Sequence, residues 1–230
     1  MPERHQGIQT SNGTLPNEFH GEDARRLLSW ARRSLRTFPW RRETDPYRLA
    51  ITELMLVRTQ AGQVARVWDD FFARFPTLAS LADADPVQAE AALKPLGLRW
   101  RSRRILEFAR AASSRADWLD NAEDLPGAGP YVLAAVRVGA SGFGTLPVDV
   151  TIARVISRFF GIGVVGESRR NAHVLHVATS MGRRSRAYFH SWLDLAAIIC
   201  TPKLPACEKC PLQSGCRSVT SFMIPSTAPR

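Results

Sequence analysis

The four cysteines of this 230-residue chain all fall within one short stretch near its C-terminus. They are Cys200, Cys207, Cys210 and Cys216, in the spacing C-x6-C-x2-C-x5-C. Two disulfides are not expected in a chain of this size without features of secretion. Four thiolates this close in sequence can instead enclose one metal centre, either a [4Fe-4S] cluster or zinc. Structural zinc sites usually show two Cys-x-x-Cys pairs, so a single pair favours the cluster over zinc or free thiols.

Upstream of the cysteines the apolar residues follow the periodicity of α-helices, for example over 24–35 and 64–72. Asp45-Pro46 and Asp85-Pro86 predict helix starts, because aspartate caps a helix and proline suits its first turn. Further helices are expected over 101–114, 131–141, 150–160, 170–181 and 186–199. No segment alternates as a strand would, and no solenoid repeat is found. The sequence predicts an all-α fold.

The chain is strongly basic, with 31 Lys and Arg against 21 Asp and Glu and a net charge of +10. Arginines gather at 99–104 and 182–186. Such a charge favours a polyanion such as nucleic acid, because neutralised phosphates release counterions; a solvated arginine-rich surface is the alternative. No apolar run is long enough for a membrane span, and residues 1–21 lack the apolar core of a signal peptide. We therefore expect a disordered leader over 1–21 and a cytoplasmic, nucleoid-associated protein.

Residues 125–129 have the sequence Leu-Pro-Gly-Ala-Gly and precede an apolar helical segment. Gly127 and Gly129 permit positive φ and leave no side chain between the backbone and a phosphate. With Ala128 between them, successive N–H groups at a helix N-terminus form an anion-binding nest. An ordinary helix–helix turn is the alternative interpretation.

Glu53 is an acid in an apolar helical segment, since its neighbours one turn away on both sides are all apolar. A carboxylate on such a face is costly unless it is paired or functional, and desolvation raises its pKa. Glu53 is therefore a candidate general acid, with a buried ion pair to an arginine as the alternative.

The cysteine spacing at the end of an all-α basic chain, together with the Leu-Pro-Gly-Ala-Gly turn, resembles the endonuclease III/MutY superfamily of helix-hairpin-helix-GPD DNA glycosylases. The resemblance covers about residues 22–217. It implies a two-domain all-α fold whose central six-helix domain spans 45–150, with the helix-hairpin-helix at about 118–141. The second domain would hold the iron–sulfur cluster and combine two segments, 22–44 and 151–220, followed by a tail over 221–230.

The resemblance also implies the catalytic residues. Asp149 matches the essential aspartate, which stabilises the oxocarbenium-like sugar; it is also suited to cap the helix over 150–160. Glu53 matches the glutamate that protonates the base or places water. Tyr131 stands where strand-cleaving members carry a lysine nucleophile, and a phenol forms no Schiff base. The chain is thus expected to be a monofunctional glycosylase that leaves an abasic site, unless Tyr131 merely packs the hairpin.

DNA contacts are expected from two further segments. Arg58 and Gln60, after the Glu53 helix, are candidates for contacting the opposite strand. Leu98, Arg99 and Trp100 are candidates for the wedge that fills the gap left by an extruded nucleotide. Inward packing of Trp100 is equally compatible with the sequence. The expected partner is double-stranded DNA with a mispaired or damaged base, bound by a monomer.

Two subfamilies compete for the substrate base. Several short segments resemble thymine-mismatch enzymes, which remove thymine or uracil opposite guanine: Arg58-Thr59, Ala61-Gly62, the Tyr131 hairpin and residues 197–200. Adenine glycosylases are the first alternative, although they normally carry Gln-Gln-Thr-Gln at 57–60 and a further recognition domain not expected here. A non-catalytic iron–sulfur DNA-binding protein is the second alternative. Thr151 and His190 each replace an asparagine common in both subfamilies, and Thr151 lies next to the expected chemistry.

Overall fold

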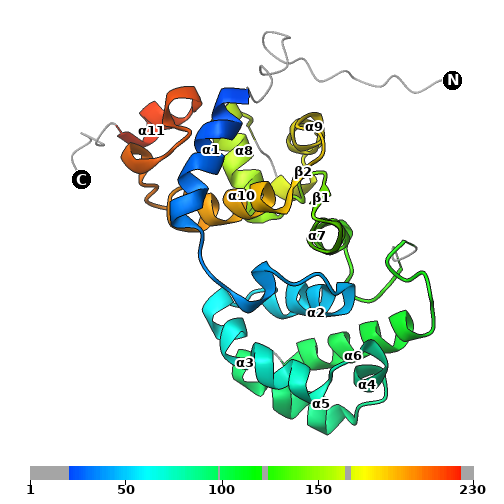
Figure 1. The fold of residues 1–230 in the computed structure, drawn as a ribbon. Helices are drawn as coiled ribbons and strands as arrows, with labels where there is room; N and C mark the ends of the chain where they lie inside the picture. The colour runs from blue at the N-terminus through cyan, green and yellow to red at the C-terminus, as the bar shows by residue number, and fades with distance from the viewer. Residues whose placement is uncertain (1–20, 98, 121–123, 164–166, 224–230) are drawn as a thin grey trace, which may run out of the picture.

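The structure is a computed structural model that describes residues 21–97, 99–120, 124–163 and 167–223 (Figure 1). Leu98 lies outside the described residues, as do most of the expected leader and tail. Residue 21 already belongs to the first helix, and residues 221–223 belong to the last.

Helices dominate the described part of the chain, and most of them begin within two residues of the expected positions. In chain order the α-helices and strands are α1 (Gly21–Ser34), α2 (Pro46–Leu56), α3 (Ala61–Arg74), α4 (Leu78–Ala82), α5 (Pro86–Leu93), α6 (Arg99–Ser113), α7 (Pro130–Ser141), β1 (Phe143–Gly144), α8 (Val150–Phe160), α9 (Ala172–Ser180), β2 (Arg184–Ser185), α10 (Arg186–Ile198) and α11 (Val219–Met223). Short 3-10 helices lie between some of them, at Pro39–Arg41, Lys94–Leu96, Ser168–Arg170, Cys207–Lys209 and Gln213–Gly215. The prediction of an all-α fold is confirmed.

Local sequence signals explain where several helices begin. Asp45 accepts a hydrogen bond from the Tyr47 N–H at 2.9 Å, and Asp85 accepts one from the Val87 N–H at 2.7 Å. Both aspartates are N-caps followed by proline, as predicted, because the side-chain oxygen satisfies an otherwise unpaired helical N–H.

The sequence did not predict the short helices α4 and α11 or the two short strands. Phe143 pairs with Ser185 and Gly144 with Arg184 in an antiparallel pair between β1 and β2. Two residues a strand are too few to create the alternation by which a strand is recognised in a sequence. The pair joins the end of α7 to the start of α10.

The hydrophobic core divides into two clusters, which correspond to two lobes in Figure 1. The first cluster is formed by residues between 40 and 136, mainly from α2 to α7. The second combines α1 with α8, α9 and α10, and also includes Ala135 and Val138 of α7. Helix α7 thus contributes to both cores, and Tyr131 at its start packs against both. The exact domain limits stay a prediction.

Candidate active site

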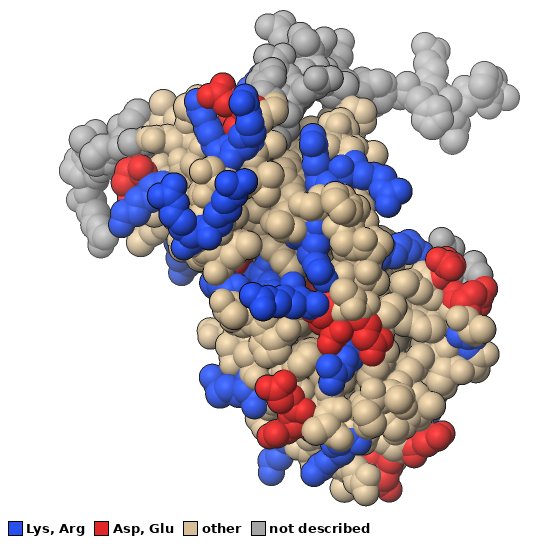
Figure 2. Space-filling model, in the orientation of Figure 1, with Lys and Arg blue, Asp and Glu red and all other residues tan. Residues whose placement is uncertain are grey.

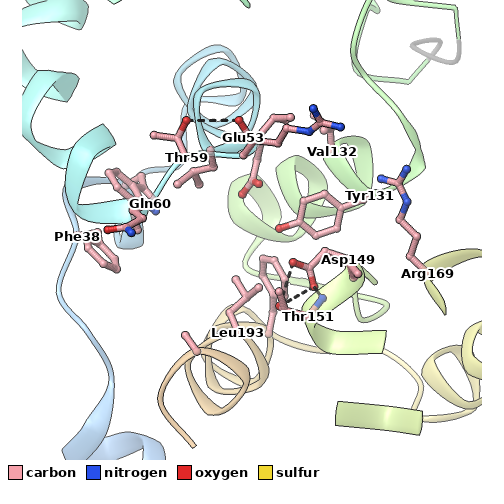
Figure 3. Close-up of a pocket in the computed structure, with 18 of the residues that line it drawn as sticks. Phe38, Glu53, Thr59, Gln60, Tyr131, Val132, Asp149, Thr151, Arg169 and Leu193 are labelled. Atoms are coloured by element: carbon pink, nitrogen blue, oxygen red, sulfur yellow. Dashed lines mark hydrogen bonds between the residues drawn. The ribbon is translucent and has the colours of Figure 1, made fainter. Parts of the chain in front are cut away.

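A cleft of about 1080 Å³ lies between the two lobes. Its walls come from α2 and the following turn, the segment before α2, the first turns of α7 and α8, and one face of α10. Glu53, Tyr131 and Asp149 all line it, and Figure 3 shows their side chains pointing toward one another from α2, α7 and the start of α8. The structure therefore brings together the three residues that the sequence nominated for chemistry.

Glu53 lines the cleft, and most of its side chain is surrounded by other residues of the protein. Its pKa is raised from 4.5 to about 7, chiefly by burial. A hydrogen bond with Tyr131 lowers that pKa, the charge of Asp149 raises it, and the charge of Arg41 lowers it. The result is a carboxyl group that exchanges a proton near neutral pH, as a general acid requires. The alternative of a buried ion pair is not supported, because no ion pair to Glu53 is found among the described residues.

Tyr131 is the second residue of α7 and is partly buried between the two cores. Burial raises the pKa of its phenol well above 10, and the charges of Glu53 and Asp149 raise it further. Tyr131 thus remains a neutral hydroxyl that is hydrogen-bonded to Glu53. The alternative that Tyr131 only packs the hairpin does not account for its position, because the residue both packs against the two cores and lines the cleft.

Asp149 is the N-cap of α8, so the capping interpretation holds alongside its place in the cleft. Its Oδ1 accepts hydrogen bonds from the Thr151 N–H at 3.0 Å and from the Ile152 N–H at 2.7 Å. These bonds fix the carboxylate at the N-terminus of α8, where the helix dipole is positive. A fixed negative charge beside the cleft can stabilise a developing positive charge on a bound sugar.

A partly buried ionic cluster at the wall of the cleft was not predicted from the sequence. Asp194 of α10 is fully buried, and it accepts hydrogen bonds from the Arg36 Nε at 2.9 Å and the Arg41 Nη2 at 2.6 Å. The backbone N–H of Arg36 also donates to Asp194, at 2.9 Å. Arg41 keeps its Nε and Nη1 buried without a hydrogen-bond partner among the described residues. This cluster ties the segment before α2 to α10 and thereby joins the two walls of the cleft.

The predicted glycine turn adopts a special backbone conformation. Gly127 has φ +82, and a Cβ there would lie 2.9 Å from Leu54 and 3.2 Å from Arg104. Gly129 is the N-cap of α7, which has no side-chain cap. The Ala128 N–H is bound to the Leu125 carbonyl and the Gly129 N–H to the Gly127 carbonyl. Any anion at this turn would therefore meet the N-terminus of α7 rather than a nest of three free N–H groups.

Three of the candidate DNA-contacting residues, Arg58, Gln60 and Trp100, line the cleft. Arg58 is exposed with φ +55, and Gln60 is the exposed N-cap of α3. The turn between them is supported from α6, because Arg101 donates a hydrogen bond to the Val57 carbonyl. Trp100 also lines the cleft and is 44% exposed, so the alternative that it packs inward is wrong. The backbone of Arg99 begins α6.

The cysteines line a second, small cavity of about 30 Å³. None of the four forms a disulfide, and the rest of the lining is mostly apolar. Arg158 donates a hydrogen bond to the Cys200 Sγ at 3.5 Å and another to the Thr201 carbonyl at 2.7 Å. In the described part of the chain no three His, Cys, Asp or Glu side chains lie at the spacing of a single bound metal ion. Four thiols facing one apolar cavity are a donor set compatible with an iron–sulfur cluster, which stays a prediction.

His190, one of the two departures from the expected pattern, lies on α10 and lines the cleft. Its pKa is lowered to about 3 by burial and by the charges of Arg41 and Arg186. The imidazole is therefore neutral at physiological pH. The other departure, Thr151, lies beside Asp149 in the same cleft (Figure 3).

Comparison with known proteins identifies the family. A model of the HhH-GPD superfamily base excision DNA repair proteins matches residues 51–174, more than half of the chain, and the chain belongs to this family. It is 32% identical to a thymine/uracil-DNA glycosylase of Methanothermobacter thermautotrophicus over 83% of this chain and 90% of that protein. It is 31% identical to human adenine DNA glycosylase, covering 84% of this chain but 38% of the human protein.

Solved structures agree with this placement. A thermostable thymine-DNA glycosylase superposes with a TM-score of 0.75 at 30% identity, over 86% of this chain and 95% of that one. A DNA complex of endonuclease III shares the fold, with a TM-score of 0.71 at 18% identity over 87% and 94% of the two chains. Within the described residues, no helix has the length and hydropathy needed to span a membrane.

Proposed function

We propose that the protein is a monofunctional DNA glycosylase of base excision repair that hydrolyses the N-glycosidic bond of thymine or uracil mispaired with guanine. The observation that carries the proposal is the meeting of Glu53, Tyr131 and Asp149 in one cleft between the lobes. The thymine/uracil-DNA glycosylase and the thymine-DNA glycosylase structure named above support the choice of base.

Asp149, Glu53 and Tyr131 each have a separate role when the N-glycosidic bond is broken. Asp149, held at the start of α8, stabilises the positive charge that grows on the sugar as the base departs. Glu53, with a pKa of about 7, donates a proton or hydrogen bond on the side of the base and can then orient water. Tyr131 supplies no amine, so no Schiff base forms and the DNA strand is left intact at an abasic site.

Duplex DNA is the expected partner of the basic surface. On the face shown in Figure 2, lysine and arginine side chains gather on the upper lobe and along the boundary between the lobes. Arg58, Trp100 and Arg104 lie at the rim of the cleft, where charge can bind phosphates and a flat ring can fill a gap in the base stack. We propose that the protein binds the mispaired duplex as a monomer.

We also propose that Cys200, Cys207, Cys210 and Cys216 hold a [4Fe-4S] cluster. Supporting this, the four thiols face one small cavity with a mainly apolar lining. The cluster would hold the C-terminal loop in shape, and no step of the reaction passes through it.

The test is single-turnover excision from labelled duplexes containing T:G, U:G, A:G or adenine opposite 8-oxoguanine, each with and without alkali. We expect alkali-dependent cleavage of the T:G and U:G duplexes, and its loss in Asp149→Asn and Glu53→Gln. Asp85→Asn is the matched control, because Asp85 caps α5 away from the cleft. Cleavage only at adenine would replace the proposal with an adenine glycosylase, and binding without any cleavage would favour a non-catalytic DNA-binding protein.

A further inference from the structure

Thr151 makes two hydrogen bonds that capping of α8 does not require. An N-cap aspartate ordinarily accepts from the backbone N–H groups of the second and third helical residues, as Asp149 does from Thr151 and Ile152. In addition, the Thr151 Oγ1 lies 2.9 Å from Oδ1 and 3.0 Å from Oδ2 of the same carboxylate. The hydroxyl thus spans both oxygens of the residue proposed to stabilise the sugar cation.

As a consequence, the two oxygens of the Asp149 carboxylate accept different numbers of hydrogen bonds. Oδ1 accepts from two backbone N–H groups and faces the hydroxyl as well, whereas within the described part of the chain Oδ2 has only the Thr151 hydroxyl as a donor. Oδ2 therefore keeps the greater capacity to interact with a cation. Because threonine is branched at Cβ, its χ1 angle has few rotamers, and in the one observed the hydroxyl contacts both carboxylate oxygens.

We propose that Thr151 is a positioning residue that fixes the plane of the Asp149 carboxylate so that Oδ2 is presented to the sugar in the cleft. The inference rests on the proposed glycosylase chemistry, but it does not depend on which base is removed. The family resemblance predicts asparagine at position 151, and the proposal gives a role to the threonine found there. Its hydroxyl supplies a hydrogen-bond donor to the Asp149 carboxylate.

The experiment measures recognition of charge on the sugar independently of the base. Binding is compared for two duplexes, one with a cationic pyrrolidine and one with a neutral tetrahydrofuran in place of the target deoxyribose. The ratio of their affinities reports how well a carboxylate faces the sugar cation, because a mimic of the charged transition state gains from the same contact. The excision rate at saturating enzyme is measured in parallel.

Thr151→Val keeps the shape of the side chain and both backbone capping bonds but removes the hydroxyl. We expect the preference for the cationic duplex and the single-turnover rate to fall roughly 10- to 100-fold, with little change in affinity for the neutral duplex. Thr151→Ser restores the donor and should recover most of both. Thr179→Val, which removes an exposed threonine hydroxyl from α9, should change neither.

A preference for the cationic duplex that is unchanged in Thr151→Val would overturn the inference, and so would a wild-type protein with no such preference. If Thr151→Val unfolds at a lower temperature than the wild type, Thr151→Ser provides the test. A stable serine variant that does not regain the preference for the cationic duplex contradicts the role of the hydroxyl. A wild-type protein that prefers the cationic duplex but excises neither thymine nor uracil would refute the proposed substrate and leave the role of Thr151 supported.

Discussion

The raised pKa of Glu53 makes replacement by glutamine a test of the site's electrostatics as well as its chemistry. Raising the pKa from 4.5 to about 7 corresponds to about 3 kcal/mol, at about 1.4 kcal/mol for each factor of ten. Well below pH 4.5 the carboxyl is protonated in both the folded and the unfolded chain, so it contributes no difference in stability. As the pH rises toward 7 only the unfolded chain ionises, and the folded state becomes progressively less favourable.

Above about pH 7 the full cost is present, so Glu53→Gln should stabilise the protein most at alkaline pH. We expect the stabilisation to be about 2 kcal/mol greater at pH 8 than at pH 5.5, while excision is lost at both. Urea unfolding of both proteins at the two pH values measures the difference. Glu107→Gln, an exposed change on α6, is the control. An equal effect of Glu53→Gln at both pH values would refute the reasoning, because the carboxyl would then not be desolvated.

Three further substitutions test the partly buried ionic cluster, the glycine turn and the cysteine ligands. Asp194→Asn leaves two arginines facing a neutral amide in a buried position and should lower the free energy of unfolding by about 3 to 5 kcal/mol, measured in urea. Gly127→Ala should lower it by about 1 to 2 kcal/mol, since an alanine at φ +82 is strained, and should also weaken duplex binding. Cys210→Ser should remove the visible absorbance of an iron–sulfur centre and the bound iron, measured by metal analysis.

The first two of these changes have a control in the same chain. Asp124→Asn breaks an exposed ion pair with Arg115 and should cost far less than Asp194→Asn. Gly129→Ala has open space for its Cβ and φ −69, so it should barely change stability. Comparable losses in the paired variants would contradict the burial and backbone arguments, and iron retained in Cys210→Ser would contradict the assignment of that ligand.

The sequence by itself determined the features that depend on neighbouring residues. Asp45-Pro46 and Asp85-Pro86 begin helices because a cap and a fixed φ act within one turn. The positive φ of Gly127 follows from its place in the Leu-Pro-Gly-Ala-Gly turn. The apolar surroundings of Glu53 were visible as helical spacing, and they indicated the rise of its pKa that burial in the structure produces.

Only the tertiary structure decided which distant residues meet. The segment holding Arg36 lies 158 positions from Asp194, and no local pattern links them. The hydrogen bond between Tyr131 and Glu53, the exposure of Trp100 and the place of His190 in the cleft likewise arise where two lobes pack together. Helix periodicity specifies which face is buried but not the element against which it packs, so the cleft and its charges depend on the whole fold.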